Sequence, residues 1–163
     1  MDWHNYFMNL VYLVSMRSKD ESTHIGAVIV RPDKSIASTG YNSFCSGMDD
    51  SVKERQDRPL KYFYFEHAET NAIHAAAKHG TAIKGCTLYT NGIPCADCAR
   101  AIIQAGIVKV YYDALWESLS PEKWKESAKH SLAMFDECGV DCQPLARIKL
   151  FQPIRFMRGK YLL

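Results

Sequence analysis

The spacing of apolar and polar residues predicts a helix followed by a hairpin in the first quarter of the chain. Residues 2–18 place apolar side chains at helical intervals and therefore predict a helix. The apolar run 25–32 ends in a Pro-Asp turn signal and predicts a buried strand, and residues 35–42 alternate like its hairpin partner. The polar segment 43–60 shows neither period. We expect a long irregular loop there, and such loops in compact domains are often functional.

Helix and strand patterns alternate along the rest of the chain. The predicted helices span 68–78, 95–105 and 121–138, and the predicted strands span 86–90 and 108–113. A glycine follows each helix, where its conformational freedom suits a helix end. The last 20 residues contain short apolar pieces that Pro144 and Pro153 interrupt, and they predict no further element. This order indicates one α/β domain, residues 1–163, built around a mixed sheet.

Composition narrows the classes of function. The chain has 163 residues, a formal net charge of +2 and 47% hydrophobic residues, as expected of a soluble globular protein. This charge is too small for a nucleic-acid coat, and no apolar run reaches the ~18 residues that span a membrane. The acidic and aromatic N-terminus differs from a secretory signal. We expect a cytoplasmic protein (in the host cytoplasm if the source is viral), with neither membrane nor nucleic acid as its partner.

The six cysteines indicate a metal site rather than disulfides. They occupy positions 45, 86, 95, 98, 138 and 142. Because the expected compartment is reducing, Cys95 and Cys98 of the Cys-Ala-Asp-Cys motif are better explained as a metal or redox pair. We expect the other four to be buried thiols that pack as small hydrophobic groups. The alternative is a second zinc site made of Cys138, Cys142 and a histidine.

Three potential metal ligands and one carboxylate lie at the predicted starts of two helices. Cys95 and Cys98 are three residues apart in a first helical turn, close enough to bind one ion, and a helix N-terminus favours thiolates. His67 would add an imidazole, and three protein ligands leave the fourth tetrahedral position open, as in catalytic zinc sites. Such an ion activates water. Glu69, two residues after His67, is placed to carry protons between that water and a substrate. The pattern His-x-Glu followed by Pro-Cys-x-x-Cys is the zinc-deaminase signature.

These motifs resemble those of the cytidine/deoxycytidylate deaminase superfamily, and most closely those of its deoxycytidylate (dCMP) deaminases. The sequences "HAETNAI" (67–73) and "PCADCARAI" (94–102) carry the resemblance to the superfamily. The flanking sequences "RSKDESTHIGAVIV" (17–30) and "KYFYFEHAETNAI" (61–73) carry the resemblance to the dCMP enzymes. The match extends over about residues 8–115, with the motifs in order and at compatible spacing.

The resemblance implies a zinc-dependent hydrolase that converts dCMP to dUMP and ammonia. It makes His67, Cys95 and Cys98 the ligands of a zinc cofactor. It makes Glu69 the catalytic residue that shuttles protons while hydroxide attacks C4 of cytosine. In this interpretation, the nucleotide substrate dCMP is the principal partner of the protein.

The resemblance also implies contacts with the rest of the nucleotide. The backbone N–H of Ala68 would contact the pyrimidine carbonyl, and Asn42 of "GYN" would bind the deoxyribose hydroxyl. The 5′-phosphate needs charge-assisted donors. The candidates to provide them are Arg17, Lys19, Arg58 and Lys61.

Fold, regulation and assembly follow from the same resemblance. The implied fold is the three-layer α/β/α cytidine-deaminase-like fold with a mixed five-stranded sheet. The product would serve dTTP synthesis, dCTP and dTTP would act as allosteric activator and inhibitor, and the enzyme would be a homohexamer. Two departures bear on this: "GYNSFCSG" has Ser43 and Cys45 where the family usually has glycine and proline, and Lys78 stands where regulated relatives carry an arginine. A lysine lacks the planar fork of arginine.

Three other functions compete with this interpretation. A deaminase of tRNA or single-stranded DNA would need a basic, aromatic-lined groove, and both the net charge of +2 and the sequence "PCADCAR" argue against it. A deaminase of free nucleosides would share the zinc site. A catalytically silent zinc- or nucleotide-binding protein is the alternative outside the enzymes. The presence of Glu69 and the lack of a fourth protein ligand argue against a purely structural zinc.

Overall fold

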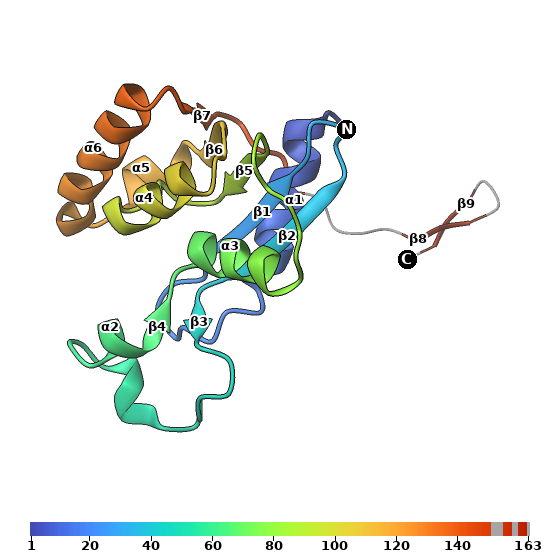
Figure 1. Cartoon of the computed structure of the whole chain (residues 1–163). Coiled ribbons are helices and arrows are strands. Elements are labelled where there is room, and N and C mark those ends of the chain that lie inside the picture. Colours follow the sequence, from blue (N-terminus) through green and yellow to red (C-terminus); the bar gives the residue numbers. More distant parts are fainter. Residues whose placement is uncertain (151–154, 158–159, 163) are drawn as a thin grey trace.

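A mixed five-stranded sheet forms the centre of the fold (Figure 1). The computed structural model describes residues 1–150, 155–157 and 160–162. In spatial order the strands are β2 (Ile36–Tyr41), β1 (Gly26–Val30), β5 (Thr87–Thr90), β6 (Lys109–Asp113) and β7 (Asp141–Leu145). β1 is antiparallel to β2 and β5, whereas β5, β6 and β7 are parallel to one another. The predicted hairpin and the predicted mixed five-stranded sheet are confirmed.

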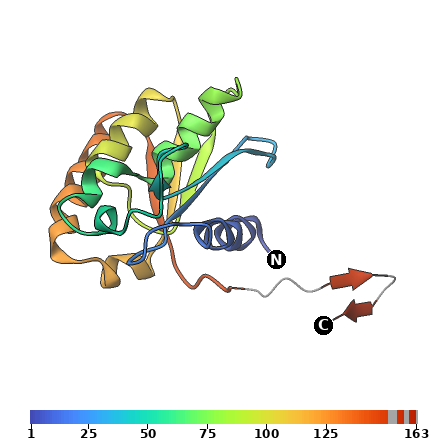
Figure 2. The same cartoon turned by 90° about the horizontal axis from the view of Figure 1, so that it is seen from below.

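Helices cover both faces of the sheet and make three layers (Figures 1 and 2). One face carries α1 (Trp3–Ser15), and the other carries α3 (Ala68–Lys78), α4 (Ala96–Gln104) and α6 (Glu122–Glu137). The side chains of β1 alternate between two cores, with Val28 and Val30 beside Phe7 of α1, and Ala27 and Ile29 on the opposite face. Because both faces are covered, β1 is buried throughout, which explains its continuous apolar sequence. The α/β/α prediction is confirmed.

Small residues let α3 lie close against the sheet. Ala68, Ala72 and Ala76 are buried along one side of this helix. A Cβ atom at Gly40 of β2 would lie 2.3 Å from the carbonyl oxygen of Ala68 and 2.3 Å from the amide nitrogen of Ala72. Only glycine fits at this crossing. The start of α3, and the residues just before it, are therefore held in place against the sheet.

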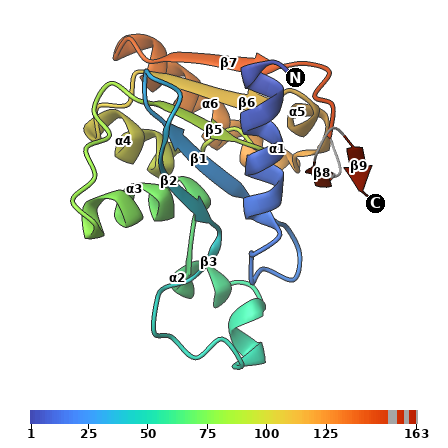
Figure 3. The same ribbon diagram turned by 90° about the vertical axis from the view of Figure 1, so that its right-hand side faces the viewer.

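Residues 43–66, called the arm below, extend from the body of the molecule (Figure 3). At its base β3 (Ser43–Phe44) pairs with β4 (Phe65–Glu66), and the rings of Phe44 and Phe65 lie 4.3 Å apart between centroids. Between these strands lie the 3₁₀-helix η1 (Lys53–Gln56) and the short helix α2 (Lys61–Tyr64). The prediction of an irregular loop over 43–60 is therefore wrong at β3 and η1, which are too short to give a periodic pattern.

Several elements in the last third of the chain have no counterpart among the predictions. They are α5 (Leu115–Leu119), β7, and a hairpin of β8 (Arg155–Met157) and β9 (Lys160–Leu162). Pro144, expected to interrupt any element, lies inside β7. This strand is at the edge of the sheet, where proline is tolerated. The break expected at Pro153 lies outside the described residues. Among the described helices, none combines the length and apolar character needed to cross a lipid bilayer.

Candidate active site

The starts of two neighbouring helices form the candidate site. His67 is the N-cap of α3 and Cys95 is the N-cap of α4, and Cys98 lies in the first turn of α4. N-cap side chains usually accept a hydrogen bond from the first helical turn, but neither His67 nor Cys95 does so. Both side chains are turned toward each other instead. The positive ends of two helix dipoles therefore meet at one place, which favours anionic ligands.

The three predicted metal ligands are brought together in a geometry that suits zinc. The Nδ1 atom of His67 lies 3.3 Å from Sγ of Cys95 and 3.4 Å from Sγ of Cys98, and all three donor atoms lie within 4.8 Å of one another. Zinc bonds of about 2.3 Å to sulfur and 2.0–2.1 Å to nitrogen give a tetrahedron with edges of roughly 3.6 Å. The donor set and its spacing therefore fit a zinc ion with only small movements.

Hydrogen bonds within this cluster shift the pKa values of its three donor groups. A hydrogen bond from Cys98 and another from His67 lower the pKa of Cys95 to about 4. The hydrogen bond between the two cysteines also raises the pKa of the Cys98 thiol. The hydrogen bond to Cys95 raises the pKa of His67 to about 9. These shifts favour a thiolate at Cys95 beside an imidazolium at His67. A cation bound here would take the place of these protons.

Glu69 adds a carboxylate to the same space. It is the second residue of α3, only 4% exposed, and its Oε2 accepts a hydrogen bond from Sγ of Cys98 at 3.7 Å. Burial raises the pKa of this carboxyl above its ordinary value. Glu66 helps to fix the start of α3. Its Oε1 accepts hydrogen bonds from the backbone N–H of His67 (2.9 Å) and from the hydroxyl of Thr70 (2.5 Å). Sequence reasoning gave Glu66 no role.

Among the described residues, the other cysteines belong to no second group of three metal-binding side chains. Within the described residues, the three-donor cluster of His67, Cys95 and Cys98 is the one group of histidine, cysteine and acidic side chains with metal-binding proximity. Cys86 is buried and Cys142 is half-buried, but Cys45 and Cys138 are exposed. The prediction of four buried thiols is therefore wrong for Cys45 and Cys138. Both lie in surface segments, the arm and the end of α6.

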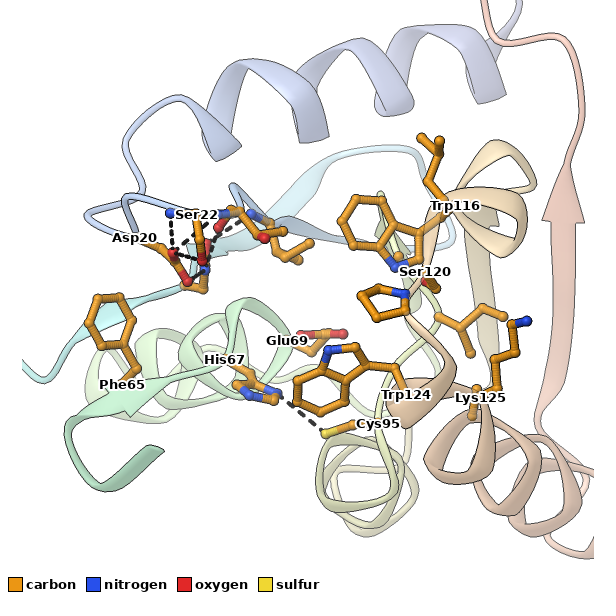
Figure 4. A pocket seen from close by; sticks show the side chains of 18 of the residues that line it. Asp20, Ser22, Phe65, His67, Glu69, Cys95, Trp116, Ser120, Trp124 and Lys125 are labelled. Atoms are coloured by element: carbon orange, nitrogen blue, oxygen red, sulfur yellow. Dashed lines mark hydrogen bonds between the residues drawn. The ribbon is translucent and has the colours of Figure 1, made fainter. Parts of the chain in front are cut away.

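A cavity of about 740 Å³ opens over the cluster (Figure 4). His67, Glu69 and Cys95 form part of its lining. Four aromatic residues form further walls: Tyr62, Phe65, Trp116 and Trp124. The ring of Trp124 meets that of His67 edge-on, with 6.2 Å between centroids. These aromatic side chains are not among the sequence-predicted site residues, because aromatic residues are more often part of the core. Their arrangement makes a largely apolar chamber with a few polar groups, as expected of a small-molecule site.

Comparison with known proteins identifies the family. The family model for the "Cytidine and deoxycytidylate deaminase zinc-binding region" matches residues 1–114. This range includes the four residues His67, Glu69, Cys95 and Cys98. The chain belongs to this family. The deoxycytidylate deaminase of Pongo abelii is 36% identical over 149 residues, which cover 86% of this chain and 78% of the relative. The uncharacterized deaminase in the luxG 3′ region of Aliivibrio fischeri is 37% identical over 139 residues, covering 85% of this chain and 90% of the relative.

Solved structures agree with this assignment. The crystal structure of the dCMP deaminase from the cyanophage S-TIM5 in its apo form matches with a TM-score of 0.67 at 26% identity, over 87% of this chain and 96% of that one. The same enzyme in complex with dCMP and dUMP matches with a TM-score of 0.65, over 86% and 94% of the two chains. The three-layer architecture is therefore the cytidine-deaminase-like fold.

In this deaminase, Asn42 lines the cavity, but its amide is fully engaged with the protein. Its Oδ1 accepts from the hydroxyl of Ser18 (2.7 Å) and the backbone N–H of Ile25 (2.8 Å). Its Nδ2 donates to the carbonyl oxygen of Thr23 (2.9 Å) and to Oδ2 of Asp20 (3.2 Å). An amide has two donors and two acceptor positions, so all four are used. Asn42 thus orders the loop before β1, and contact with a sugar would require exchange of one partner.

Lys61, a predicted phosphate ligand, forms a buried ion pair. Its Nζ lies 2.5 Å from Oδ1 of Asp20 and 3.0 Å from the hydroxyl of Ser22, and both charged side chains are 8% exposed. Burial alone would raise the pKa of Asp20, but hydrogen bonds from Lys61, Ser22 and Thr23 hold it below the ordinary value of 3.8. The pair ties the loop before β1 to the arm. The positive charge of Lys61 is therefore neutralised by Asp20 within the protein.

The other predicted substrate contacts occupy different places. Arg17 and Lys19 are exposed and lie outside the cavity lining, and Lys19 pairs with Asp50 at 3.0 Å. Arg58 lines the cavity from the arm, where its side chain is exposed. Ala68 is fully buried as the first residue of α3, so its N–H is among those that the helix itself leaves unpaired. The fold thus brings Arg58, Lys61 and Asn42 to the cavity. Arg17 and Lys19 lie away from it.

Replacement of Asp20 by asparagine should destabilise the protein strongly at neutral pH. The variant leaves the ammonium of Lys61 buried without its counterion, and breaking a buried pair in this way costs about 3–5 kcal/mol of unfolding free energy. The pKa of Asp20 is lowered in the folded state. The contribution of its carboxylate to the free energy of unfolding is therefore present above pH 3.8, the ordinary pKa, and is lost as the pH falls further. Chemical denaturation should therefore show a difference between wild type and D20N that is large at pH 7 and shrinks in acid.

The matched control is D50N, which removes the carboxylate of an exposed Asp–Lys pair. Its partner Lys19 and Asp50 itself are 52% and 47% exposed, and such surface pairs contribute about 0–1 kcal/mol. Equal loss of stability in D20N and D50N, or a D20N effect that persists unchanged at low pH, would contradict the role given to the buried pair.

Proposed function

We propose that this protein is a zinc-dependent dCMP deaminase that hydrolyses dCMP to dUMP and ammonia. The observation that carries the proposal is the convergence of His67, Cys95 and Cys98 with the buried carboxylate of Glu69 in one cavity. The named activities of the relatives support the nucleotide substrate, since the Pongo abelii protein is a deoxycytidylate deaminase and the S-TIM5 enzyme was solved with dCMP and dUMP.

The residues divide the chemistry between binding and proton transfer. His67, Cys95 and Cys98 would hold the zinc ion, which supplies a Lewis acid that makes water a nucleophile at neutral pH. Glu69 takes a proton from the attacking water and delivers protons to the cytosine ring and its amino group, which leaves as ammonia. At the end of the cycle Glu69 is again an unprotonated carboxylate. One water is consumed and the C4 amino group is replaced by oxygen.

The walls of the cavity orient the pyrimidine. Phe65, Trp116 and Trp124 offer flat apolar surfaces to a base, and they exclude bulk water from Glu69. The free N–H groups at the start of α3, that of Ala68 among them, can donate to the pyrimidine carbonyl. A base held in this way presents C4 to the donor cluster, so geometry rather than new covalent chemistry provides much of the rate enhancement.

A substrate panel tests the proposal. The purified protein with bound zinc is offered dCMP, CMP, deoxycytidine and a short oligodeoxycytidylate, and released ammonia is measured. We expect the highest kcat/KM for dCMP. Preference for the oligonucleotide would favour a polynucleotide deaminase, and preference for deoxycytidine a nucleoside deaminase. A zinc-loaded protein that releases no ammonia from any of the four would be a silent binding protein, contrary to the proposal.

The proposal extends to the cellular setting through the family resemblance alone. The dUMP product would enter dTTP synthesis, dCTP would activate and dTTP would inhibit, and the enzyme would assemble as a homohexamer in the cytoplasm. Lys78, at the end of α3, stands where regulated relatives have an arginine. Assays with added dCTP or dTTP test the regulation, and sedimentation of the purified protein tests the assembly.

A further inference from the structure

One wall of the cavity consists of a single face of α6. Six residues of this region line the cavity: Pro121, Trp124, Lys125, Ala128, Lys129 and Leu132. Their spacing of one, three and four residues places them in one stripe along the helix. At 1.5 Å per residue the stripe is about 16 Å long, much longer than a pyrimidine ring. The cavity therefore has room beyond the base, and this wall lies after the region 1–114 that the family model matches.

The chemistry of the stripe changes along and across it. The indole of Trp124 lies beside His67 and Glu69, where the base is placed in the proposed function (Figure 4). The amino group of Lys125 lies on the side of Trp124 away from His67 (Figure 4). Lys129 is one helical turn further along and is also exposed. Residues four apart on a helix are neighbours, with about 5–6 Å between Cβ atoms, so both ammonium groups can reach one anion.

The charges of these lysines are available, in contrast to that of Lys61. Asp20 compensates Lys61 inside the protein. Lys125 pairs with Glu122 at 2.5 Å, but these side chains are 55% and 84% exposed, and such a surface pair is weak. Within residues 1–150, no carboxylate lies at ion-pair distance from Lys129. The α6 wall therefore presents surplus positive charge beyond the aromatic part of the cavity.

We propose that Lys125 and Lys129 bind the phosphate of the substrate and so make this deaminase select nucleoside monophosphates over nucleosides. The inference rests on the proposed function and assigns the phosphate end of that substrate. A phosphomonoester carries about −1.5 to −2 charge at pH 7, and two ammonium donors give it charge-assisted hydrogen bonds. With the base against Trp124, the phosphate reaches the lysines from the same side of the helix. The exposed position of both lysines also lets the phosphate enter and leave without unfolding the wall.

The test compares nucleotides with nucleosides in K125Q, K129Q and the double variant. Glutamine keeps the helix propensity of lysine and removes its charge. We expect the double variant to lose about 100-fold in kcat/KM for dCMP, mostly through KM, while kcat/KM for deoxycytidine is unchanged. Competitive inhibition provides a second readout, with the Ki of dUMP rising by a similar factor and that of deoxyuridine staying constant. K84Q, at an exposed lysine between α3 and β5 outside the cavity lining, is the matched control.

Each other outcome overturns the inference in a distinct way. If the double variant loses dCMP and deoxycytidine activity equally, the lysines support the wall rather than the phosphate. If the double variant behaves as wild type and R58Q or K19Q loses dCMP selectively, the phosphate lies at the arm or the loop before β1. If the loss appears only with an oligodeoxycytidylate, the lysines read a phosphodiester backbone. A wild-type protein that binds zinc and does not deaminate dCMP would overturn the proposed function itself.

Discussion

Glutamine in place of Glu69 is expected to lower ammonia release from dCMP by about 10²–10⁴-fold, the range that a positioned acid/base group contributes. The amide has nearly the shape of the carboxyl, and the residue is 4% exposed, so the packing around it should remain intact. What the variant loses is the ability to accept a proton from water and return it to the leaving amino group. Steady-state assays of ammonia release measure this loss directly.

Zinc retention makes the E69Q result specific. Glu69 is not one of the three donors, so the variant should bind zinc in the same ratio as wild type, as measured by metal analysis. E54Q, at an exposed position in η1 outside the cavity lining, is the matched control and should keep full activity. An E69Q protein that retains both zinc and wild-type turnover would show that another group carries the protons.

Loss of one metal ligand is the second change with a large expected effect. C98S should reduce bound zinc from one ion per chain to a small fraction of that, and ammonia release should fall to background with it. Binding to the folded state alone stabilises a protein by about 4 kcal/mol when free zinc is 1,000 times Kd. The thermal transition of wild type should therefore fall on chelation and return with added zinc, whereas that of C98S should respond little to either.

C142S provides the control for this experiment. Cys142 is a half-buried thiol of β7 outside the three-donor cluster, so its loss should leave zinc content and activity unchanged. Two zinc ions per wild-type chain, reduced to one in C142S, would instead indicate a second site at Cys138 and Cys142. Full zinc retention in C98S would show that the cluster is not the metal centre.

The two helix starts that carry the candidate metal ligands could be predicted from the sequence, because their signals are local. His67 and Glu69 adjoin a helix whose predicted bounds, 68–78, are those observed, and Cys95 and Cys98 lie within one turn of the next. Short-range spacing places donors at each of the two helix starts, whereas the approach of His67 to Cys95, 28 residues away, was expected from the family signature. The alternating helices and strands were predictable for the same reason.

The substrate end of the cavity could not be predicted in this way. Lys61 and Asp20 are 41 residues apart, and each alone resembles a solvated loop charge. Only the docking of the arm on the loop before β1 buries them together. Trp124 and Lys125 likewise belong to an ordinary amphipathic pattern, and nothing in their spacing shows that their helix faces the cavity. Contacts that join distant segments depend on tertiary packing, which a one-dimensional pattern does not contain.

The edge strand and α5 illustrate a second limit. β7 contains Pro144, which is a reliable break inside a sheet but is compatible with an edge. The strand's position in the sheet is a property of the topology, so the sequence pattern alone favoured the wrong interpretation. α5 has five residues, fewer than two helical turns, and cannot display a helical period.

The use of His67 and Cys95 as helix N-caps limits how this protein can be made more stable. Serine, aspartate or asparagine at an N-cap stabilises a helix by about 1 kcal/mol relative to residues that do not cap. Protein engineers would therefore choose the N-cap positions of α3 and α4 as obvious sites for improvement. At these two positions, however, the stabilising substitutions would remove two of the three donor atoms. Gains in thermostability must come from other parts of the chain.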